Sequence, residues 1–385
     1  MKKLAIIGAS YLQNPLIWKA KSMGLETHVF AWATNDVGEK SADYFYPISI
    51  IEKEQILRKC TEIGIDGICS IASDLASQTV DFVADRLNLP GNSLECAWLS
   101  TNKYFMRKAF EKHGDPSPKS YLVENKDALL TIPLQYPVIV KPVDRSGSRG
   151  ITKLESEQGF KAAIEAALEQ GFDKKVLVEE FLTGQEYSVE CISWKGRHYF
   201  LALTKKYTSG APHYIERAHL EPAVVTDKVL EKVKRIVFHA LDSLKITDGA
   251  SHTELKIADD GDIKLIEIGS RMGGDYIGSS LVKLSTGIDF VRAVIQIAIG
   301  EEPQLSPVCK PRAAAVRFVF SEEDIEVLHQ IKAEHPEYIV FESIREIDVT
   351  SVPVVTDSSN RFGAYLLSAP DSADLEKYLP AELEG

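Results

Sequence analysis

The amino-acid sequence predicts a mixed α/β protein built from two or three domains. The chain has 385 residues, of which 44% are hydrophobic and 26% charged, an ordinary composition for globular proteins. Short apolar strands alternate with helices over residues 1–95, which predicts a parallel α/β sheet. From about residue 96 short strands follow one another with few helices between them, which indicates an α+β part. A chain of this length can bury a separate core in each domain.

The first predicted domain covers residues 1–95. Its expected elements are strands at Leu4–Ile7, Thr27–Trp32 and Gly67–Ile71 and a helix at Glu52–Ile63. The turn Gly8-Ala9-Ser10 lacks the further glycines of a dinucleotide-binding fingerprint. We therefore interpret it as an ordinary strand-to-helix turn, and a nicotinamide oxidoreductase is the weaker alternative.

The second predicted domain covers residues 96–306 and the third covers residues 307–385. The second begins with a helix at Ser100–Lys112 and continues with several short strands. Thr226 is expected to cap a long helix, which a hairpin at His252–Ile268 follows. Prolines at positions 303, 307 and 311 indicate a linker, so residues 313–385 are expected to form a small α/β tail.

Charge and cysteine content argue against several kinds of partner and site. The formal net charge is −12 without a long Lys/Arg run, which disfavours nucleic acid and anionic membrane as partners. No apolar stretch approaches the ~20 residues that span a bilayer. Five scattered cysteines predict neither a disulfide framework nor a Cys-rich zinc site. We expect a reduced, cytoplasmic protein; the sequence does not determine its oligomeric state, and a homodimer is compatible with it.

The hairpin carries the most informative pattern. With a turn in residues 259–262, the expected strand pairs are Ala258–Ile263, Lys256–Leu265 and Glu254–Glu267. Two carboxylates directly opposite, with Cβ atoms roughly 4.5–5.5 Å apart, destabilise a sheet unless a cation lies between them. Mg²⁺ is commonly held by one or two carboxylates and phosphate oxygens. Glu254 and Glu267 are therefore candidate metal ligands, and the alternative is an exposed strand face with solvated acids.

The residues after Glu267 extend this candidate site. Arg271 follows four residues later and can hold a phosphoryl group or oxyanion bidentately. Gly273 and Gly274 would let backbone N–H groups approach an anion, although they can equally form a simple turn. Asp275 can accept a hydrogen bond from a substrate ammonium.

A second set of candidates lies upstream. Lys141 ends an apolar strand, and the glycine- and serine-rich loop 144–150 follows it. Such a loop suits phosphate binding because its flexible amides can cover phosphate oxygens while the lysine neutralises charge. It lacks the Walker pattern, and a flexible turn is the alternative. Lys103 and Arg107 share one helix face, a spacing that taken alone is typical of solvated surface charges.

Another strand, residues 176–182, breaks into a loop at Thr183-Gly184. Unpaired backbone groups there can read the edge of an adenine. Glu186 can accept from ribose hydroxyls, and Lys205, at the end of a later strand, is a further candidate phosphate contact. His213, with Glu216 and His219 nearby, would line an acceptor pocket or belong to a surface loop.

In this order along the chain, these residues resemble the ATP-grasp superfamily over roughly residues 1–305. The segment Arg271-Met272-Gly273-Gly274-Asp275 is most similar to the L-amino-acid ligase and carbamoyl-phosphate-synthetase-like branch. The resemblance implies a sheet domain, then a lid-like subdomain at about residues 120–190, then a subdomain that carries the acidic pair.

The resemblance also implies a role for each candidate. The ATP-binding candidates are Lys103, Lys141, Ser146, Gly147, Ser148, Gly150, Glu179, Glu180, Phe181, Leu182, Glu186 and Lys205. Among them, residues 179–182 correspond to the adenine hinge and Glu186 to the ribose contact. Glu254 and Glu267 correspond to the carboxylates that bind Mg²⁺ or Mn²⁺. Arg271, with Lys141, corresponds to the groups that stabilise the transferred phosphoryl.

The implied activity is ATP-dependent ligation of a small carboxylate to an amine through an acyl phosphate, with release of ADP and phosphate. One position departs from the superfamily pattern Glu-x-Asn-x-Arg, because Gly269 replaces the asparagine. That change removes one metal ligand. It therefore weakens the expectation of a second metal ion more than the expectation of the reaction class. The alternatives are an ATP-grasp enzyme that uses bicarbonate and a non-catalytic nucleotide-binding module.

Overall fold

The computed structural model describes residues 1–124, 134–145, 149–211, 214–345 and 361–381. Its described strands form three sheets, two of four strands and one of eight. The first sheet is parallel, with strand order β3-β2-β1-β4. Its strands are β1 (Lys3–Ile7), β2 (Glu26–Phe30), β3 (Tyr44–Tyr46) and β4 (Gly67–Cys69). This agrees with the parallel sheet predicted from the alternation of strands and helices.

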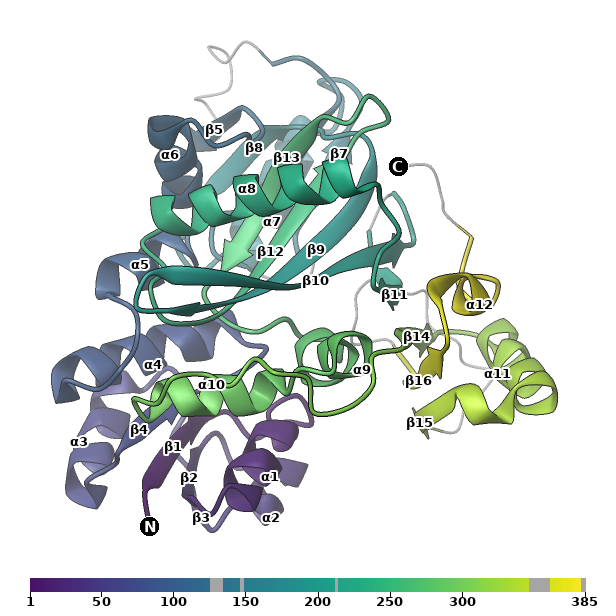
Figure 1. The fold of residues 1–385 in the computed structure, drawn as a ribbon. Coiled ribbons are helices and arrows are strands. Elements are labelled where there is room, and N and C mark those ends of the chain that lie inside the picture. The colour runs from purple at the N-terminus through teal and green to yellow at the C-terminus, as the bar shows by residue number, and fades with distance from the viewer. Residues whose placement is uncertain (125–133, 146–148, 212–213, 346–360, 382–385) are drawn as a thin grey trace.

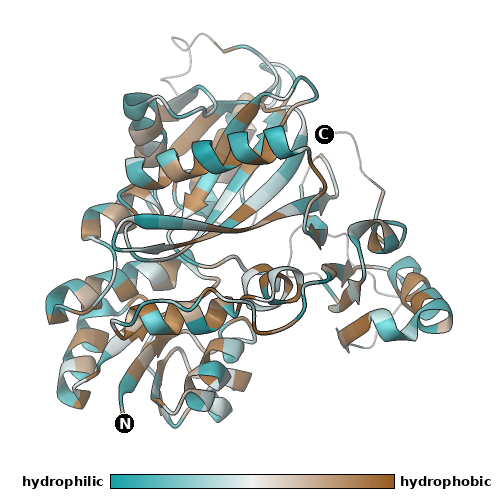
Figure 2. Cartoon of the chain, viewed as in Figure 1, coloured by the Kyte–Doolittle hydropathy of each residue, from teal (hydrophilic) through white to brown (hydrophobic). Residues whose placement is uncertain are grey.

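Helices cover both faces of this parallel sheet (Figure 1). They are α1 (Asn14–Ser22), α2 (Val37–Ser41), α3 (Lys53–Ile63) and α4 (Asp74–Leu87). A later helix, α10 (Phe290–Ala298), also packs here, and its apolar residues share a core with Leu4, Ile6 and Leu16. The brown residues of α10 in Figure 2 belong to this core. The chain thus returns to the parallel sheet after residues 96–289 have formed other elements.

The second sheet is antiparallel, with order β5-β8-β6-β7. Its strands are β5 (Ser120–Val123), β6 (Val138–Pro142), β7 (Thr152–Leu154) and β8 (Val176–Glu180). The helix α7 (Phe160–Gln170) buries Phe160, Ile164 and Ala167 in the same core as Val138, Val140 and Val178. This small sheet lies within the region predicted as a lid-like subdomain.

The third sheet has the order β13-β12-β9-β10-β11-β14-β16-β15. Its strands are β9 (Gln185–Trp194), β10 (Arg197–Thr208), β11 (Glu216–Glu221), β12 (Gly249–Ile257), β13 (Ile263–Gly269), β14 (Ala313–Val319), β15 (Ile339–Ile344) and β16 (Gly363–Ala369). The helices beside it are α5 (Leu94–Leu99), α6 (Lys103–His113), α8 (Asp227–Ser243), α9 (Val282–Thr286), α11 (Glu322–Glu334) and α12 (Ser372–Glu376). Thr226 caps α8 as predicted, since its side chain accepts from the N–H of Val229.

The C-terminal strands continue this large sheet. β14 pairs with β11 and with β16, so residues 313–369 extend the sheet that begins in the predicted second domain. The helices α11 and α12 pack on these strands at the far right of Figure 1. The three domain ranges, 1–95, 96–306 and 307–385, therefore stay predictions, and one sheet crosses the boundary between the second and the third. Within the described ranges, none of the helices is both long enough and apolar enough to span a bilayer.

The hairpin of β12 and β13 confirms the facing glutamates but corrects the rest of the register. Glu254 pairs with Glu267, whereas Leu255 pairs with Leu265 and Ile257 with Ile263. The predicted pairs Lys256–Leu265 and Ala258–Ile263 are wrong because the loop occupies residues 258–262 and shifts the strands by one position. A β-bulge at Glu254/Leu255 then compensates for the shift. Without the bulge, one of the two acids would lie on the opposite face.

Candidate active site

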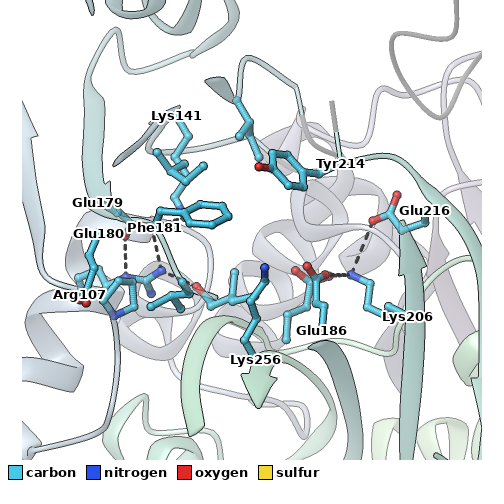
Figure 3. Close-up of a pocket in the computed structure, with 16 residues that line it drawn as sticks. Arg107, Lys141, Glu179, Glu180, Phe181, Glu186, Lys206, Tyr214, Glu216 and Lys256 are labelled. Atoms are coloured by element: carbon cyan, nitrogen blue, oxygen red, sulfur yellow. Dashed lines mark hydrogen bonds and ion pairs between the residues drawn. The ribbon is translucent and has the colours of Figure 1, made fainter. Parts of the chain in front are cut away.

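A pocket lies between the small antiparallel sheet and the large sheet, and with its open mouth it measures about 730 Å³. This volume is in the range of small-molecule sites. Apolar side chains form part of its wall: Ile139, Ile151, Phe181, Leu182 and Ile266. Charged side chains form much of the rest: Arg107, Lys141, Glu179, Glu180, Glu186, Lys206, Glu216, Glu254 and Lys256. Figure 3 shows many of these charged side chains around the pocket.

Glu179 joins two cations at one end of the pocket. Lys141 Nζ lies 2.5 Å from Glu179 Oε2, and Arg107 Nε lies 2.7 Å from Oε1. All three residues are buried. Burial lowers the pKa of Lys141, and although burial alone would raise the pKa of Glu179, Arg107 and Lys141 hold it below its ordinary value. Glu179 is thus a buried counter-ion, a role that its position in the predicted adenine hinge did not suggest.

Lys103 and Arg107 are not solvated surface residues. Lys103 Nζ lies 2.6 Å from Glu267 Oε1 and donates to the carbonyl oxygen of Arg145 at 2.8 Å. Asn102 caps α6, because its side-chain oxygen accepts from the N–H groups of Tyr104 and Phe105. The cap fixes the first turn of the helix, from which Lys103 reaches the acidic pair. The spacing of Lys103 and Arg107 correctly predicts that they share one helix face. It does not predict that this face is buried, because the burial comes from packing of the helix on the sheet.

Lys206, rather than the predicted Lys205, lines the pocket. Its Nζ lies 2.7 Å from Glu186, 2.8 Å from Glu254 and 3.7 Å from Glu216. Although burial alone would lower it, these carboxylates hold the pKa of Lys206 well above its ordinary value. Lys205 instead pairs with Glu376 of α12 at 2.9 Å. Successive residues of a strand point to opposite faces, so only one of the two lysines can reach the pocket.

The two facing glutamates are surrounded by positive charge. Glu254 is bound by Lys206 and lies 3.4 Å from His252 Nε2, while Glu267 is bound by Lys103. Against the effect of burial, Glu190 raises the pKa of His252 to about 9. Lys206 and His252 hold the pKa of Glu254 well below its ordinary value, again against burial. Glu254 is thus held as an anion. Within the described ranges, no group of three or more His, Cys, Asp or Glu side chains has metal-binding geometry.

The loop after β13 is bound to three neighbours. Arg271 forms a bidentate ion pair with Asp74 of the first domain, with an Nε–Oδ1 distance of 2.7 Å. The N–H of Gly273 donates to the buried carboxylate of Glu190 at 3.0 Å. A Cβ atom at Gly273 would lie 2.6 Å from Glu190 Oε1, which explains the need for glycine there. Both carboxylate oxygens of Asp275 accept from Arg361 at 2.8 Å.

The roles of the remaining candidates stay predictions. Ser146, Gly147, Ser148 and His213 lie outside the described residues. Gly150 has a positive φ of 72°, which supports the need for glycine at the end of that loop. Glu180 pairs with Lys264 at 3.1 Å, while Phe181 and Leu182 line the pocket. Gly274 and Asp275 remain candidate substrate contacts, although Asp275 already has a cationic partner.

Comparisons with known proteins agree with this arrangement. Residues 134–279 match the ATP-grasp domain family. Phosphoribosylamine–glycine ligase of Lactococcus lactis is 24% identical over 319 residues, which cover 79% of this chain and 76% of that protein. Human carnosine synthase 1 is 23% identical over 346 residues, 81% of this chain but only 41% of that protein, so the chain spans less than half of this relative.

A solved structure, that of L-amino acid ligase from Bacillus licheniformis, superimposes with a TM-score of 0.83. The likeness covers 98% of this chain and 96% of that chain at 23% sequence identity, and at this identity it shows the fold. The matched residues contain the strands β6, β7 and β8 of the small sheet, the strands that bear Glu186 and Lys206, and the hairpin with Glu254 and Glu267. Residues 134–279 of this chain therefore match the ATP-grasp domain family.

Proposed function

We propose that this chain is an Mg²⁺-dependent ligase that uses ATP to activate a small carboxylate for attack by an amine. The facing pair of Glu254 and Glu267 is the observation that carries this proposal. Glu254 lines a pocket with one apolar wall and several cations, and Glu267 pairs with Glu254 on the next strand. This combination fits a nucleotide and its phosphates. Relatives of the ATP-grasp superfamily named as ligases support the same reaction class.

The donor set fits a hard divalent cation. Glu254 and Glu267 are paired residues on neighbouring strands, and each has its own cationic partners: Lys206 and His252 for Glu254, and Lys103 for Glu267. Carboxylates are ligands that Mg²⁺ prefers. Glu254 and Glu267 would hold Mg²⁺, or Mn²⁺ in its place. The bound cation would neutralise negative charge on the phosphates of ATP. The apolar wall with Phe181 and Ile266 would hold the adenine, and Glu186 would accept from the ribose.

The protein's part in the reaction is to orient substrates and stabilise charge. An oxygen of the substrate carboxylate attacks the γ-phosphorus of ATP, the bond to the β,γ-bridging oxygen breaks, and ADP leaves. Lys141, Lys103 and Arg271 would stabilise the charge on the transferred phosphoryl group. The amine nitrogen then attacks the acyl carbon of the acyl phosphate, phosphate leaves, and the nitrogen loses a proton to form the amide.

The test is a screen for ADP release with Mg²⁺ and ATP, in which small carboxylates, amino acids among them, are crossed with amines. We expect at least one pair to stimulate ADP release and to form an amide detectable by mass spectrometry. Glu267→Gln should abolish this turnover while circular dichroism shows an unchanged fold, and Glu342→Gln, on the exposed strand β15, is the matched control. ADP release that needs bicarbonate and no amine would replace the proposal with a bicarbonate-using enzyme. No stimulation by any pair would contradict it.

A further inference from the structure

Asp74 and Arg271 come from different parts of the chain, 197 residues apart, yet form a bidentate pair. Arg271 Nε donates to Asp74 Oδ1 at 2.7 Å and Nη2 donates to Oδ2 at 3.1 Å. Arg271 Nη1 donates to the carbonyl oxygen of Met272 at 3.2 Å. A guanidinium group has five N–H donors, so two remain for a ligand. This pair therefore restricts the orientation of Arg271 without using all of its donors.

The carboxylate of Asp74 also lies where a side chain at position 269 would project. A Cβ atom on Gly269 would be 3.0 Å from Asp74 Oδ1 and 3.3 Å from Arg271 Nε. Contacts this short require a neighbour to move. The superfamily pattern Glu-x-Asn-x-Arg has an asparagine at this position. In this chain, a carboxylate oxygen from the first domain occupies the space beside the missing asparagine side chain.

The backbone around Asp74 fixes this placement. The N–H of Ala72 donates to the carbonyl oxygen of Met272 at 3.1 Å, the same oxygen that accepts from Arg271. Ala72 has a positive φ of 59°, and Ser73 caps α4 by accepting from the N–H of Ala76. Asp74 is the first residue of α4, so its Cα position is set by the cap and by the contact with the loop after β13.

We propose that Asp74 is a positioning residue for the ligase reaction, and that its carboxylate replaces the asparagine side chain of the superfamily pattern in space, beside Arg271, but not as a metal ligand. Asp74 holds Arg271 in one orientation before ATP binds, so that its remaining donors are already aligned with the phosphoryl group. A direct metal contact is not assigned to Asp74, because both of its oxygens accept from Arg271. This inference rests on the proposed function, in which Arg271 stabilises the transferred phosphoryl.

The experiment compares Asp74→Ala, Gly269→Asn and the double variant Asp74→Ala/Gly269→Asn, each assayed as the full chain with Mg²⁺, ATP and the substrate pair that the screen identifies. We expect Asp74→Ala to lower kcat about 100-fold while KM for ATP changes by less than about threefold, because an aligned transition-state donor is lost. Asp85→Ala, at the far end of the same helix and paired with the exposed Arg86, is the matched control and should retain full kcat.

The double variant tests the replacement itself. Gly269→Asn alone should lower both kcat and the midpoint of thermal unfolding, because the new side chain meets Asp74. Removal of the Asp74 side chain in the double variant should restore the midpoint and raise kcat at least about tenfold above Gly269→Asn, a non-additivity expected of residues in contact. A purely structural role for Asp74 would instead make the double variant less stable than either single one.

Two results would overturn the inference: wild-type kcat in Asp74→Ala, or a folded double variant with neither the midpoint nor kcat improved over Gly269→Asn. Failure of the proposed function is distinguishable, because it would appear as a wild-type chain that releases no ADP with any substrate pair. The unfolding midpoints of the three variants would still test the contact between positions 74 and 269 in that case.

Discussion

Lys206 on β10 reaches across β9 to Glu254 on β12, and its Nζ lies 2.8 Å from Glu254 Oε1. The same amino group lies 2.7 Å from Glu186. Lys206 thereby connects the acid proposed for the ribose to one of the acids proposed for the metal. Lys206 thus links two halves of the proposed ATP site as one buried cation. Loss of Lys206 would leave Glu186 and Glu254 close to one another without a counter-charge.

Lys206→Met should lower ADP release by about 100-fold or more, because it removes a charge that faces the phosphates and leaves Glu254 and Glu186 to repel each other. The measurement is the Mg²⁺-dependent rate of ADP release with the active substrate pair. Lys205→Met is a matched control on the same strand, since Lys205 pairs with Glu376 on the other face. Equal losses in both variants would contradict the assignment of Lys206 to the site.

Glu179→Gln should lower the free energy of unfolding by about 2–4 kcal/mol, because the buried cations Arg107 and Lys141 would lose their shared counter-ion. Urea unfolding followed by circular dichroism measures this change. The neighbouring Glu180 pairs with Lys264 at the surface, so Glu180→Gln should cost less than about 1 kcal/mol. A loss no larger than that of the control would show that the buried cluster contributes little to stability.

Glu221→Gln should stabilise the protein at pH 8 and have little effect at pH 5. Burial raises the pKa of Glu221 to about 8 from its ordinary 4.5, although hydrogen bonds from Ser285 and Thr204 act against this. The folded state therefore keeps the proton that the unfolded state releases above pH 4.5, and stability falls as the pH rises from 4.5 to 8. Glutamine does not ionise, so the variant should avoid this loss, which is on the order of 4 kcal/mol at pH 8.

Thermal unfolding of wild type and Glu221→Gln across this pH range measures the effect. The difference between their midpoints should grow steadily with pH. A difference independent of pH would mean that Glu221 is already ionised in the folded protein. The control is Glu376→Gln, which changes an exposed carboxylate of α12 whose pKa is not raised.

Arg361→Met should destabilise the protein by about 1–3 kcal/mol, less than the cost for a fully buried pair, because Asp275 retains partial exposure. Arg361 holds the pKa of Asp275 below its ordinary value against the effect of burial, so this stabilisation is present at neutral pH and is lost as acid protonates Asp275. The double variant Asp275→Asn/Arg361→Met should lose less than the sum of the two single changes. Strict additivity, measured by urea unfolding at pH 7, would show that the pair does not couple the loop after β13 to the C-terminal strands.

Local patterns in the sequence predict much of this protein. The alternation of strands and helices predicts the parallel sheet, and the turn-forming residues 259–262 predict a hairpin with Glu254 opposite Glu267. These predictions succeed because periodicity and turn chemistry depend on neighbouring residues. The register of the hairpin shows where such predictions fail. The loop is one residue longer at its start than expected, and only a β-bulge brings the two acids opposite one another again.

Tertiary structure decided which charged residues meet. Lys205 and Lys206 are adjacent lysines on one strand. Their partners differ because α12 packs on one face of the strand, where Lys205 pairs with Glu376, and the acids of the pocket lie on the other face, where Lys206 pairs with Glu186. The burial of Arg107 depends on Glu179, 72 residues away, and the contact of Asp74 with Gly269 and Arg271 joins two domains. A sequence pattern identifies residue types able to bind phosphate or metal, but the partner that fixes each charge is distant along the chain and is set by how the sheets pack.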